Sequence, residues 1–275
     1  MGYDEGNVDQ QYPAVPASGT AGGEGIMTEN NTSGTKMIAH RGLSGIEREN
    51  TAEAFVAAGN RPFFGAECDV HVTSDGKYVV FHDDWTCRIC DRSLLVEETD
   101  FDTLRSLRIR ESGGEAFSET LKIATLDEYL RIMARYRKTA VIELKNPMEE
   151  HHIGKIVDIC RGLYALEHIN FISFDFNNLM SVRRFSPGQK IQFLADNLGA
   201  VNIGVLRENR CDLDIAWGLL SEEYIRELHE NDIGVNCWTV DDPACADRLI
   251  SWGVDYITSN ILLRAPDGRA VRADS

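Results

Sequence analysis

Short apolar segments alternate with amphipathic segments from Met37 to Arg264. An example of the second kind is LDEYLRIMARY, which follows a capping Thr125 and whose apolar residues form one helical stripe. Nine segments have the pattern of β-strands: MIAHRG, AECDVHVT, KYVVFHD, AVIELKNP, INFISF, IQFLAD, DLDIAW, GVNCWTV and VDYITS. Repeated strand and helix units predict an α/β fold, a (β/α)₈ TIM barrel, and no GxGxxG follows a strand as in dinucleotide-binding sheets.

One pair of segments breaks the regular alternation. Asp75 and Gly76 form a tight turn between AECDVHVT and KYVVFHD, which leaves no room for a helix between parallel strands. We therefore expect a distorted barrel with a β-hairpin-like segment around residues 66–82. Because nine strands exceed eight, either this hairpin adds an arm or one segment lies outside the barrel. Residues 84–122 are predicted to form a loop and lid with a short helix from Asp102 to Leu107.

The composition divides the chain into three parts. Residues 1–36 are rich in glycine, polar and acidic residues, and such a segment buries too little apolar surface to order itself, so a disordered leader is predicted. Residues 37–264 form the barrel, and residues 265–275 are expected to be a polar tail. Met27 and Met37 are both candidates for the natural start.

Charge and cysteine content restrict the possible partners and compartment. The net charge of -16 argues against nucleic acid and anionic membranes as partners. No apolar run approaches the roughly 20 residues of a membrane span, and no secretory signal is recognised, so a cytoplasmic protein is predicted. The seven scattered cysteines fit reduced core thiols, and the Cys87–Cys90 CxxC spacing is interpreted as locally structural because no second CxxC accompanies it.

Ionisable side chains occur at the ends of several predicted strands, where a purely structural strand would avoid them. Active sites of TIM barrels lie at the carboxyl ends of the strands, so these side chains are expected to converge. Three converging carboxylates would repel one another, and a divalent cation is the simplest reason to cluster them. An all-oxygen set favours Mg²⁺, Ca²⁺ or Mn²⁺ over Zn²⁺. The converging residues are His40, Arg41, Glu67, Asp69, His82, Glu143 and Lys145.

The cationic and imidazole groups complete the predicted chemistry. A guanidinium at Arg41 and an ammonium at Lys145 beside a metal suit a phosphate group. His40 and His82 can then act as general acid and base on opposite sides of a phosphodiester. Metal-assisted P–O cleavage is the reaction that these residue types indicate.

Several motifs in order resemble those of the glycerophosphodiester phosphodiesterase family. They are HRG at 40–42, ENT at 49–51, ExD at 67–69, DG and VVFHD through residue 83, TLDE from 125, IELK through 145, and WTVDDP followed by WGVDYITSN. The resemblance implies a distorted TIM barrel and a divalent metal held by Glu67, Asp69 and Glu143. It also implies His40 and His82 as the acid/base pair, Arg41 and Lys145 near phosphate, and Trp238 as an aromatic residue lining the pocket. A buried structural tryptophan is an almost equally good interpretation of Trp238.

The family resemblance implies hydrolysis of a small-molecule glycerophosphodiester to glycerol 3-phosphate and an alcohol. Two alternatives remain: a lysophospholipase D-like activity, which would need an apolar groove, and a non-catalytic phosphodiester-binding protein. The assignment of the base between the two histidines, the ion and the oligomeric state stay open. Asp83 is expected to orient His82 or cap the loop, His71 to be structural or at the rim, and residues 149–152, EEHH, to be a solvated helix start.

Overall fold

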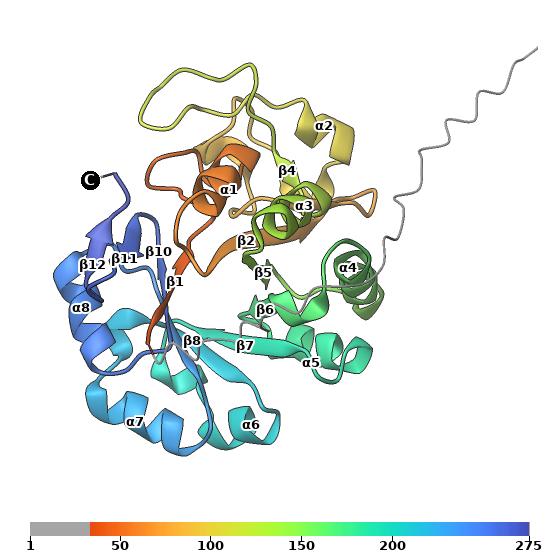
Figure 1. Cartoon of the computed structure of the whole chain (residues 1–275). Helices are drawn as coiled ribbons and strands as arrows, with labels where there is room; N and C mark the ends of the chain where they lie inside the picture. The colour runs from red at the N-terminus through yellow and green to blue at the C-terminus, as the bar shows by residue number, and fades with distance from the viewer. Residues whose placement is uncertain (1–33, 275) are drawn as a thin grey trace, which may run out of the picture. The chain divides into compact units, whose positions relative to one another are not determined.

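A computed structural model describes residues 34–274, and within them eight parallel strands form a closed barrel (Figure 1). The barrel closes because β1 pairs with both β2 and β10, with Ile38 opposite Gly65 and Thr258. This confirms the predicted (β/α)₈ TIM barrel. In order around the barrel the strands are β1 (Lys36–Ala39), β2 (Gly65–Val72), β5 (Thr139–Leu144), β6 (Ile169–Ser173), β7 (Lys190–Ala195), β8 (Asp212–Ala216), β9 (Val235–Trp238) and β10 (Tyr256–Ser259).

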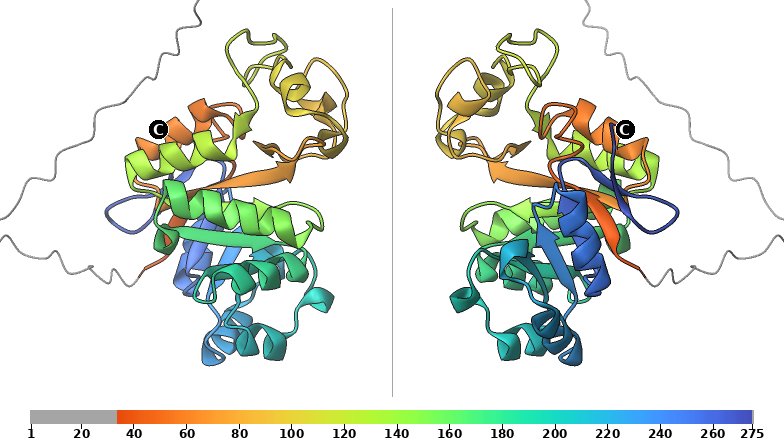
Figure 2. Two further views of the ribbon diagram at one scale, coloured as in Figure 1. Left: turned by 90° about the vertical axis from the view of Figure 1, so that its right-hand side faces the viewer. Right: turned by 90° about the vertical axis from the view of Figure 1, so that its left-hand side faces the viewer.

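Helices surround the barrel and connect successive strands (Figures 1 and 2). A helix follows each barrel strand along the chain except β10, which a small hairpin follows instead. These connecting helices are α1 (Ala52–Gly59), α3 (Leu126–Tyr136), α4 (Glu150–Leu163), α5 (Phe176–Phe185), α6 (Ile203–Glu208), α7 (Glu222–Glu230) and α8 (Pro243–Ser251). Helix α3 spans the amphipathic segment LDEYLRIMARY, as its apolar stripe predicted, whereas the six-residue α6 is too short for a clear apolar period.

The ninth predicted strand lies outside the barrel. It is β3 (Tyr78–Val80), which pairs antiparallel with β2, so the predicted hairpin around residues 66–82 is present. Gly76 occupies the turn with a φ of +73°, a backbone conformation that glycine adopts without a steric penalty. The two-residue strand β4 (Ala124–Thr125) extends this antiparallel sheet beyond β3.

Residues 84–122, here called the arm, have a small core of their own. The arm contains helix α2 (Phe101–Arg105), close to the predicted helix at 102–107. Its buried apolar side chains pack against the hairpin and include Ile89, Val96, Leu104, Leu107 and Ile109. Figure 2 shows the arm beyond the carboxyl end of β2. The segment expected to be a loop and lid is therefore a folded insertion at the end of the barrel where active sites form.

Local sequence signals explain how the helices attach to the barrel. Thr125 caps α3, as the sequence predicted, and Glu128 completes a capping box with it. The buried Tyr129 hydroxyl then donates to the carbonyl oxygen of Ala66 at 2.7 Å. This bond fixes α3 against β2, the strand that carries two of the candidate site residues.

The carboxyl-terminal segment differs from the expected polar tail. Strand β11 (Leu262–Arg264) pairs antiparallel with β12 (Ala270–Arg272), and the Ala270 N–H donates to Asp247 Oδ1 at 2.7 Å. Contacts with α8 order this segment, and a polar composition gives no sign of such contacts. The predicted leader falls mainly on residues 1–33, outside the described residues, and Lys36 already belongs to β1. No helix within residues 34–274 has both the length and the apolar character needed to cross a bilayer.

Candidate active site

The first part of the site is the turn that follows β1. Arg41 and Gly42 both have left-handed backbone conformations, with φ of 54° and 74°. A Cβ atom at Gly42 would lie 2.7 Å from the backbone carbon of Ala54, so only glycine fits between this turn and α1. The turn directs the Arg41 N–H to Glu67 Oε2, which accepts a hydrogen bond at 2.8 Å. The strained turn thus fixes His40 and Arg41 relative to the acidic residues of β2.

Three buried carboxylates form the acidic cluster of Glu67, Asp69 and Glu143. Glu67 and Asp69 share one face of β2 because they are two residues apart, and Asp69 is opposite Glu143 in the β2–β5 register. Within residues 34–274 these are the acids whose ligand oxygens lie within 4.8 Å of one another. The strand period and the barrel register together produce the convergence that the sequence predicted.

Two cations and one amide surround the acidic cluster. Lys145 Nζ lies 2.9 Å from Glu143 Oε1 and 3.4 Å from Asp69 Oδ1. Arg41 Nε lies 3.6 Å from Asp69 Oδ2, and Asn50 Nδ2 donates to the same oxygen at 2.8 Å. Although burial alone would raise it, the pKa of Asp69 is lowered by the charges of Lys145 and Arg41. Asp69 is therefore ionised and held from several sides.

The other two carboxylates behave in the opposite way. Burial and the neighbouring Asp69 charge raise the pKa of Glu143 from 4.5 to about 7. Burial, Asp69 and Glu143 likewise raise the pKa of Glu67 well above its ordinary value. Glu67 Oε1 has no hydrogen-bond partner among the described residues, although it is buried. Buried carboxylates that repel one another, one of them with an unpaired oxygen, fit a divalent cation bound by oxygen ligands.

A hydrogen-bond chain determines the tautomer of His40. Asn260 Nδ2 donates to Asp241 Oδ2 at 2.6 Å, so the amide oxygen of Asn260 faces His40. That oxygen lies 2.8 Å from His40 Nδ1, which must therefore carry the proton. Burial, with the charge of Arg41, lowers the pKa of His40 from 6.5 to about 4. His40 is neutral near pH 7, and its Nε2 has a free lone pair.

A carboxylate, rather than an amide, orients His82. Asp83 Oδ1 accepts from His82 Nδ1 at 2.6 Å, in agreement with the expectation that Asp83 orients this imidazole. Asp83 in turn accepts from Arg88 Nε at 2.5 Å. Burial lowers the pKa of His82, and the charges of Lys145 and Arg41 act in the same direction. The two imidazoles thus differ in their partners: a neutral amide for His40 and an anion for His82.

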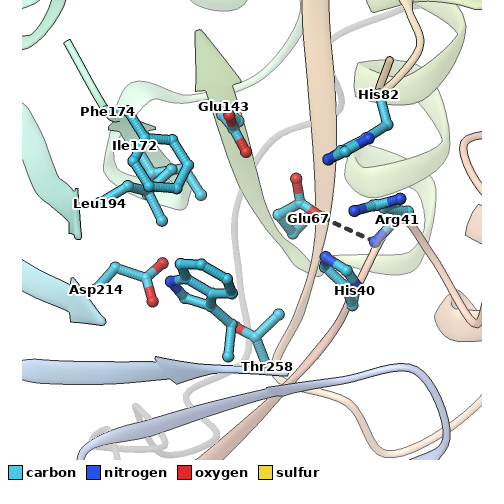
Figure 3. Close-up of a pocket in the computed structure, with 11 residues that line it drawn as sticks. His40, Arg41, Glu67, His82, Glu143, Ile172, Phe174, Leu194, Asp214 and Thr258 are labelled. Carbon is cyan, nitrogen blue, oxygen red and sulfur yellow. Dashed lines mark hydrogen bonds between the residues drawn. The ribbon is translucent and has the colours of Figure 1, made fainter. Parts of the chain in front are cut away.

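The two histidines line one cavity of about 160 Å³, here called the central cavity, together with Glu67 and Glu143 of the acidic cluster. In Figure 3, His40, Arg41 and His82 lie on one side of it, Glu67 and Glu143 lie between, and Asp214 with apolar side chains lies opposite. Trp238 also lines the cavity, as the family resemblance implied. Asp69 completes the acidic cluster, and Lys145 contacts it from the side. All eight site residues predicted from sequence therefore gather in one place.

A second hollow, the outer groove, lies beside the central cavity and shares Glu143 and Phe174 with it. It measures about 500 Å³. Its other lining residues include Lys145, Asn146, Pro147, Phe176 and Phe193. Glu143 and Phe174 thus border both hollows, and aromatic side chains line each of them.

The residues that sequence reasoning assigned outside the site do lie outside it. His71 is buried and its Nδ1 lies 2.8 Å from Glu97 Oε1, which agrees with a structural role. Glu150 begins α4 and pairs with Arg184, and the EEHH segment belongs to no metal-type cluster within residues 34–274.

Sequence reasoning missed several residues of the site, namely Glu49, Asn50, Arg88, Asp214 and Asn260. Asn50 and Glu49 stand in the ENT motif, so their position beside Arg41 was a usable signal. Asn260 lies 220 positions from His40 and meets it only because the barrel closes. Asp214 shares β8 with Asp212, and nothing in the local sequence distinguishes the buried acid from its neighbour.

The fold and the site define a TIM-barrel enzyme with acidic, imidazole and cationic groups around one cavity. The sequence matches the glycerophosphoryl diester phosphodiesterase family over residues 40–262. It is 28% identical to a glycerophosphodiester phosphodiesterase of Caldanaerobacter subterraneus, over 82% of this chain and 94% of that protein. It is 29% identical to a putative glycerophosphodiester phosphodiesterase of Bacillus subtilis, over 82% of this chain and 93% of that protein.

Solved structures give the same result. A phosphodiesterase of Oleispira antarctica, solved in complex with its product sn-glycerol-3-phosphate, superimposes with a TM-score of 0.75 at 25% sequence identity, covering 82% of this chain and 93% of that one. The chain belongs to the glycerophosphoryl diester phosphodiesterase family. It is accordingly a phosphoric diester hydrolase, which argues against the alternative of a non-catalytic binding protein.

Proposed function

We propose that this enzyme hydrolyses glycerophosphodiesters to glycerol 3-phosphate and an alcohol, with a divalent cation and two histidines. One observation carries the proposal: His40 and His82 line the same cavity as the carboxylates of Glu67 and Glu143. An acid/base pair beside a cation site is the arrangement that phosphodiester cleavage needs. The named activity of the relatives and the product bound to the Oleispira antarctica enzyme support the same substrate class.

Glu67, Asp69 and Glu143 are the proposed ligands of one cation, Mg²⁺ or Ca²⁺, with Mn²⁺ as a third candidate. When bound, such a cation supplies Lewis-acid stabilisation of negative charge on the phosphoryl oxygens. Arg41 and Lys145 lie beside the acidic cluster and add a guanidinium fork and an ammonium for the remaining phosphate oxygens. This arrangement allows an anionic substrate to enter a protein whose net charge is -16.

His40 is the proposed general base. Its Nδ1 proton is held by Asn260, its pKa lies at about 4, and its Nε2 is free to accept a proton. In the reaction His40 Nε2 takes the proton of the attacking hydroxyl, from water or from a neighbouring hydroxyl of the substrate. Asn260 keeps the ring in the orientation that this transfer needs.

His82 is the proposed general acid. The Asp83 carboxylate, 2.6 Å from His82 Nδ1, stabilises the positive charge of a protonated imidazole, whereas the amide partner of His40 does not. In the reaction His82 Nε2 gives its proton to the leaving alcohol oxygen. Its protonation at the moment of reaction depends on the negative charge that the substrate brings, since burial lowers the pKa of the free group.

A lysophospholipase D-like activity is the second candidate, and the outer groove is the observation that favours it. Phe174, Phe176 and Phe193 line this groove next to Lys145, and they offer the apolar surface that an acyl chain would need. The groove is also lined by the polar side chains of Lys145 and Asn146, which suit a polar alcohol. Comparing turnover of glycerophosphocholine and lysophosphatidylcholine by the same preparation distinguishes the two candidates.

The direct experiment measures release of sn-glycerol 3-phosphate from glycerophosphocholine by chelated enzyme, before and after addition of Mg²⁺ or Ca²⁺. We expect activity to be lost on chelation and restored by one of these cations. His40→Ala and His82→Ala should each lower kcat by about 100-fold or more. His151→Ala is the matched control, because this histidine is exposed at the start of α4. Metal-independent turnover, or full activity in either cavity variant, would refute the proposal.

A further inference from the structure

Asp214 on β8 is a buried carboxyl group in the central cavity for which the reaction proposed above has no use. Its exposed fraction is 1%, and it lines the cavity together with the histidines and Glu67. Figure 3 shows it on the side opposite His40 and His82, with its carboxyl group pointing into the cavity. Among residues 34–274, the acidic cluster of metal-ligand type does not include Asp214. A role for this acid must therefore come from its own contacts.

The two carboxyl oxygens of Asp214 have different surroundings. Asn236 Nδ2 donates to Oδ2 at 2.9 Å, and Asn236 is itself held by the hydroxyl of Thr258, which donates to its Oδ1 at 3.2 Å. Asp214 Oδ1 has no hydrogen-bond partner within the described part of the chain, although it is buried. Buried polar atoms almost always have a hydrogen-bond partner, so one anchored oxygen and one free oxygen are typical of a group kept for a ligand.

The wall around Asp214 indicates the chemistry of that ligand. Ile172 and Leu194 line the same part of the cavity in Figure 3 and offer only apolar surface. Trp238 adds a donor, because its buried Nε1 also lacks a partner among residues 34–274. A cavity of about 160 Å³ with apolar walls, one acceptor and one donor fits a short carbon skeleton that carries hydroxyl groups.

The charges of the site orient such a ligand. Arg41 and Lys145 are near the acidic cluster, whereas the Asp214 side has no cation among its described lining residues. A phosphate is therefore attracted to the cluster side, where the two cations lie. The uncharged part of the substrate is left to face Asp214.

We propose that Asp214 Oδ1 binds a free hydroxyl of the substrate's glyceryl group, so that Asp214 makes the enzyme selective for polyol phosphodiesters. This inference rests on the proposed function, because it concerns the same cavity. A site with a hydrogen-bonding group built for a substrate hydroxyl discriminates strongly against an analogue without it, since the buried group is then left unpaired. Asp214 thus distinguishes a glyceryl ester from an ester with a plain alkyl chain.

The test compares paired ligands that differ only in their hydroxyl groups. Binding of sn-glycerol 3-phosphate and n-propyl phosphate is measured by calorimetry in the presence of Mg²⁺, and kcat/KM is measured for glycerophosphocholine and propyl phosphocholine. The unchanged enzyme should prefer the glyceryl member of each pair by about 10- to 100-fold. In Asp214→Leu, the ratio of the two binding constants should fall to near one, because n-propyl phosphate makes no contact with Asp214 Oδ1 that the variant loses.

Two further variants separate recognition from folding. Asp214→Asn keeps an oxygen for Asn236 and turns its NH₂ group to the cavity, so it should show an intermediate preference; it also serves if the leucine variant does not fold. Asp212→Asn, two residues earlier on β8 and outside the cavity lining, should behave as the unchanged enzyme. An equal loss for both members of each pair, or an unaltered preference in both Asp214 variants, would overturn the inference.

The binding measurement keeps this inference separate from the proposed function. Should the enzyme hydrolyse neither phosphocholine ester and yet bind sn-glycerol 3-phosphate in an Asp214-dependent way, the proposed reaction fails and the role of Asp214 stands. If the enzyme hydrolyses both esters and its preference does not depend on Asp214, the proposed reaction stands and the role of Asp214 fails.

Discussion

Arg88 forms a two-pronged ion pair with Glu49: Nη1 lies 2.7 Å from Oε2, and Nη2 lies 2.6 Å from Oε1. The same guanidinium donates to Asp83, which orients His82. Glu49 also accepts from Arg41 Nη1 at 2.8 Å. A single side chain of the arm is therefore connected to the proposed general acid and to the proposed phosphate ligand, which gives the folded insertion a function in positioning both.

Replacing Arg88 should lower activity without removing any group that contacts substrate. We expect Arg88→Ala to lower kcat about 10-fold or more, the range usual for residues that orient a functional group. The pH dependence of kcat should also shift, because Asp83 then has one partner fewer. Steady-state kinetics over a range of pH values measures both effects.

Arg92→Ala is the control for this variant. Arg92 lies on the same arm, and its guanidinium donates to Thr103 and Ser106 rather than to site residues. Equal kinetics for the two variants would mean that the arm does not position the site.

The turn after β1 makes a second prediction. Gly42→Ala should destabilise the fold by about 2 kcal/mol, because the backbone has a φ of +74° and the new Cβ would collide with α1. Activity should fall with stability, since relaxation of this turn moves His40 and Arg41. Chemical denaturation and glycerophosphocholine turnover measure the two effects. Gly188→Ala is the control, since a Cβ there meets no atom within 4 Å; similar losses in both variants would contradict the prediction.

The pKa of Glu143 predicts a pH-dependent stability difference in chelated protein. Folding raises the pKa of Glu143 from 4.5 to about 7. Its contribution to the free energy of unfolding is therefore fully present below pH 4.5. That contribution is lost as the pH rises to 7, because the unfolded protein releases this proton more easily than the folded protein does. Glu143→Gln removes this dependence. The free energy of unfolding of this variant, relative to that of the unchanged protein, should therefore increase by about 3 kcal/mol between pH 4.5 and pH 7, at about 1.4 kcal/mol per pKa unit.

Denaturant titrations of both proteins at several pH values measure this difference, in which the contributions of shared groups such as His40 cancel. Glu149→Gln is the control, because the side chain of Glu149 is largely exposed and lies outside the acidic cluster. A difference for Glu143→Gln that does not change with pH, or that matches the difference for Glu149→Gln, would contradict the prediction.

The sequence was sufficient to predict most of the barrel and the acidic cluster, for identifiable physical reasons. Each barrel strand is a short apolar run, and a strand period of two determines that Glu67 and Asp69 share a face. The convergence of Glu143 with them follows from the neighbouring position of β2 and β5, which the general rule for TIM-barrel sites already implies.

The residues that escaped prediction depend on contacts between distant parts of the chain. Arg88 reaches Glu49 across 39 positions, and Asn260 reaches His40 across 220, so neither pairing has a local signature. The arm was expected to be a loop because its apolar residues have no regular period, yet they form a core once β3 and β4 extend the sheet. Strand β12 likewise exists through its pairing with β11.

A crystal structure of the protein soaked with Mn²⁺, with anomalous scattering recorded from the ion, tests the account most directly. We expect one ion per chain, with oxygens of Glu67, Asp69 and Glu143 at about 2.0 to 2.6 Å and both His40 and His82 facing it. An ion bound elsewhere, or carboxylates that turn away from one another when the metal is supplied, would contradict the account.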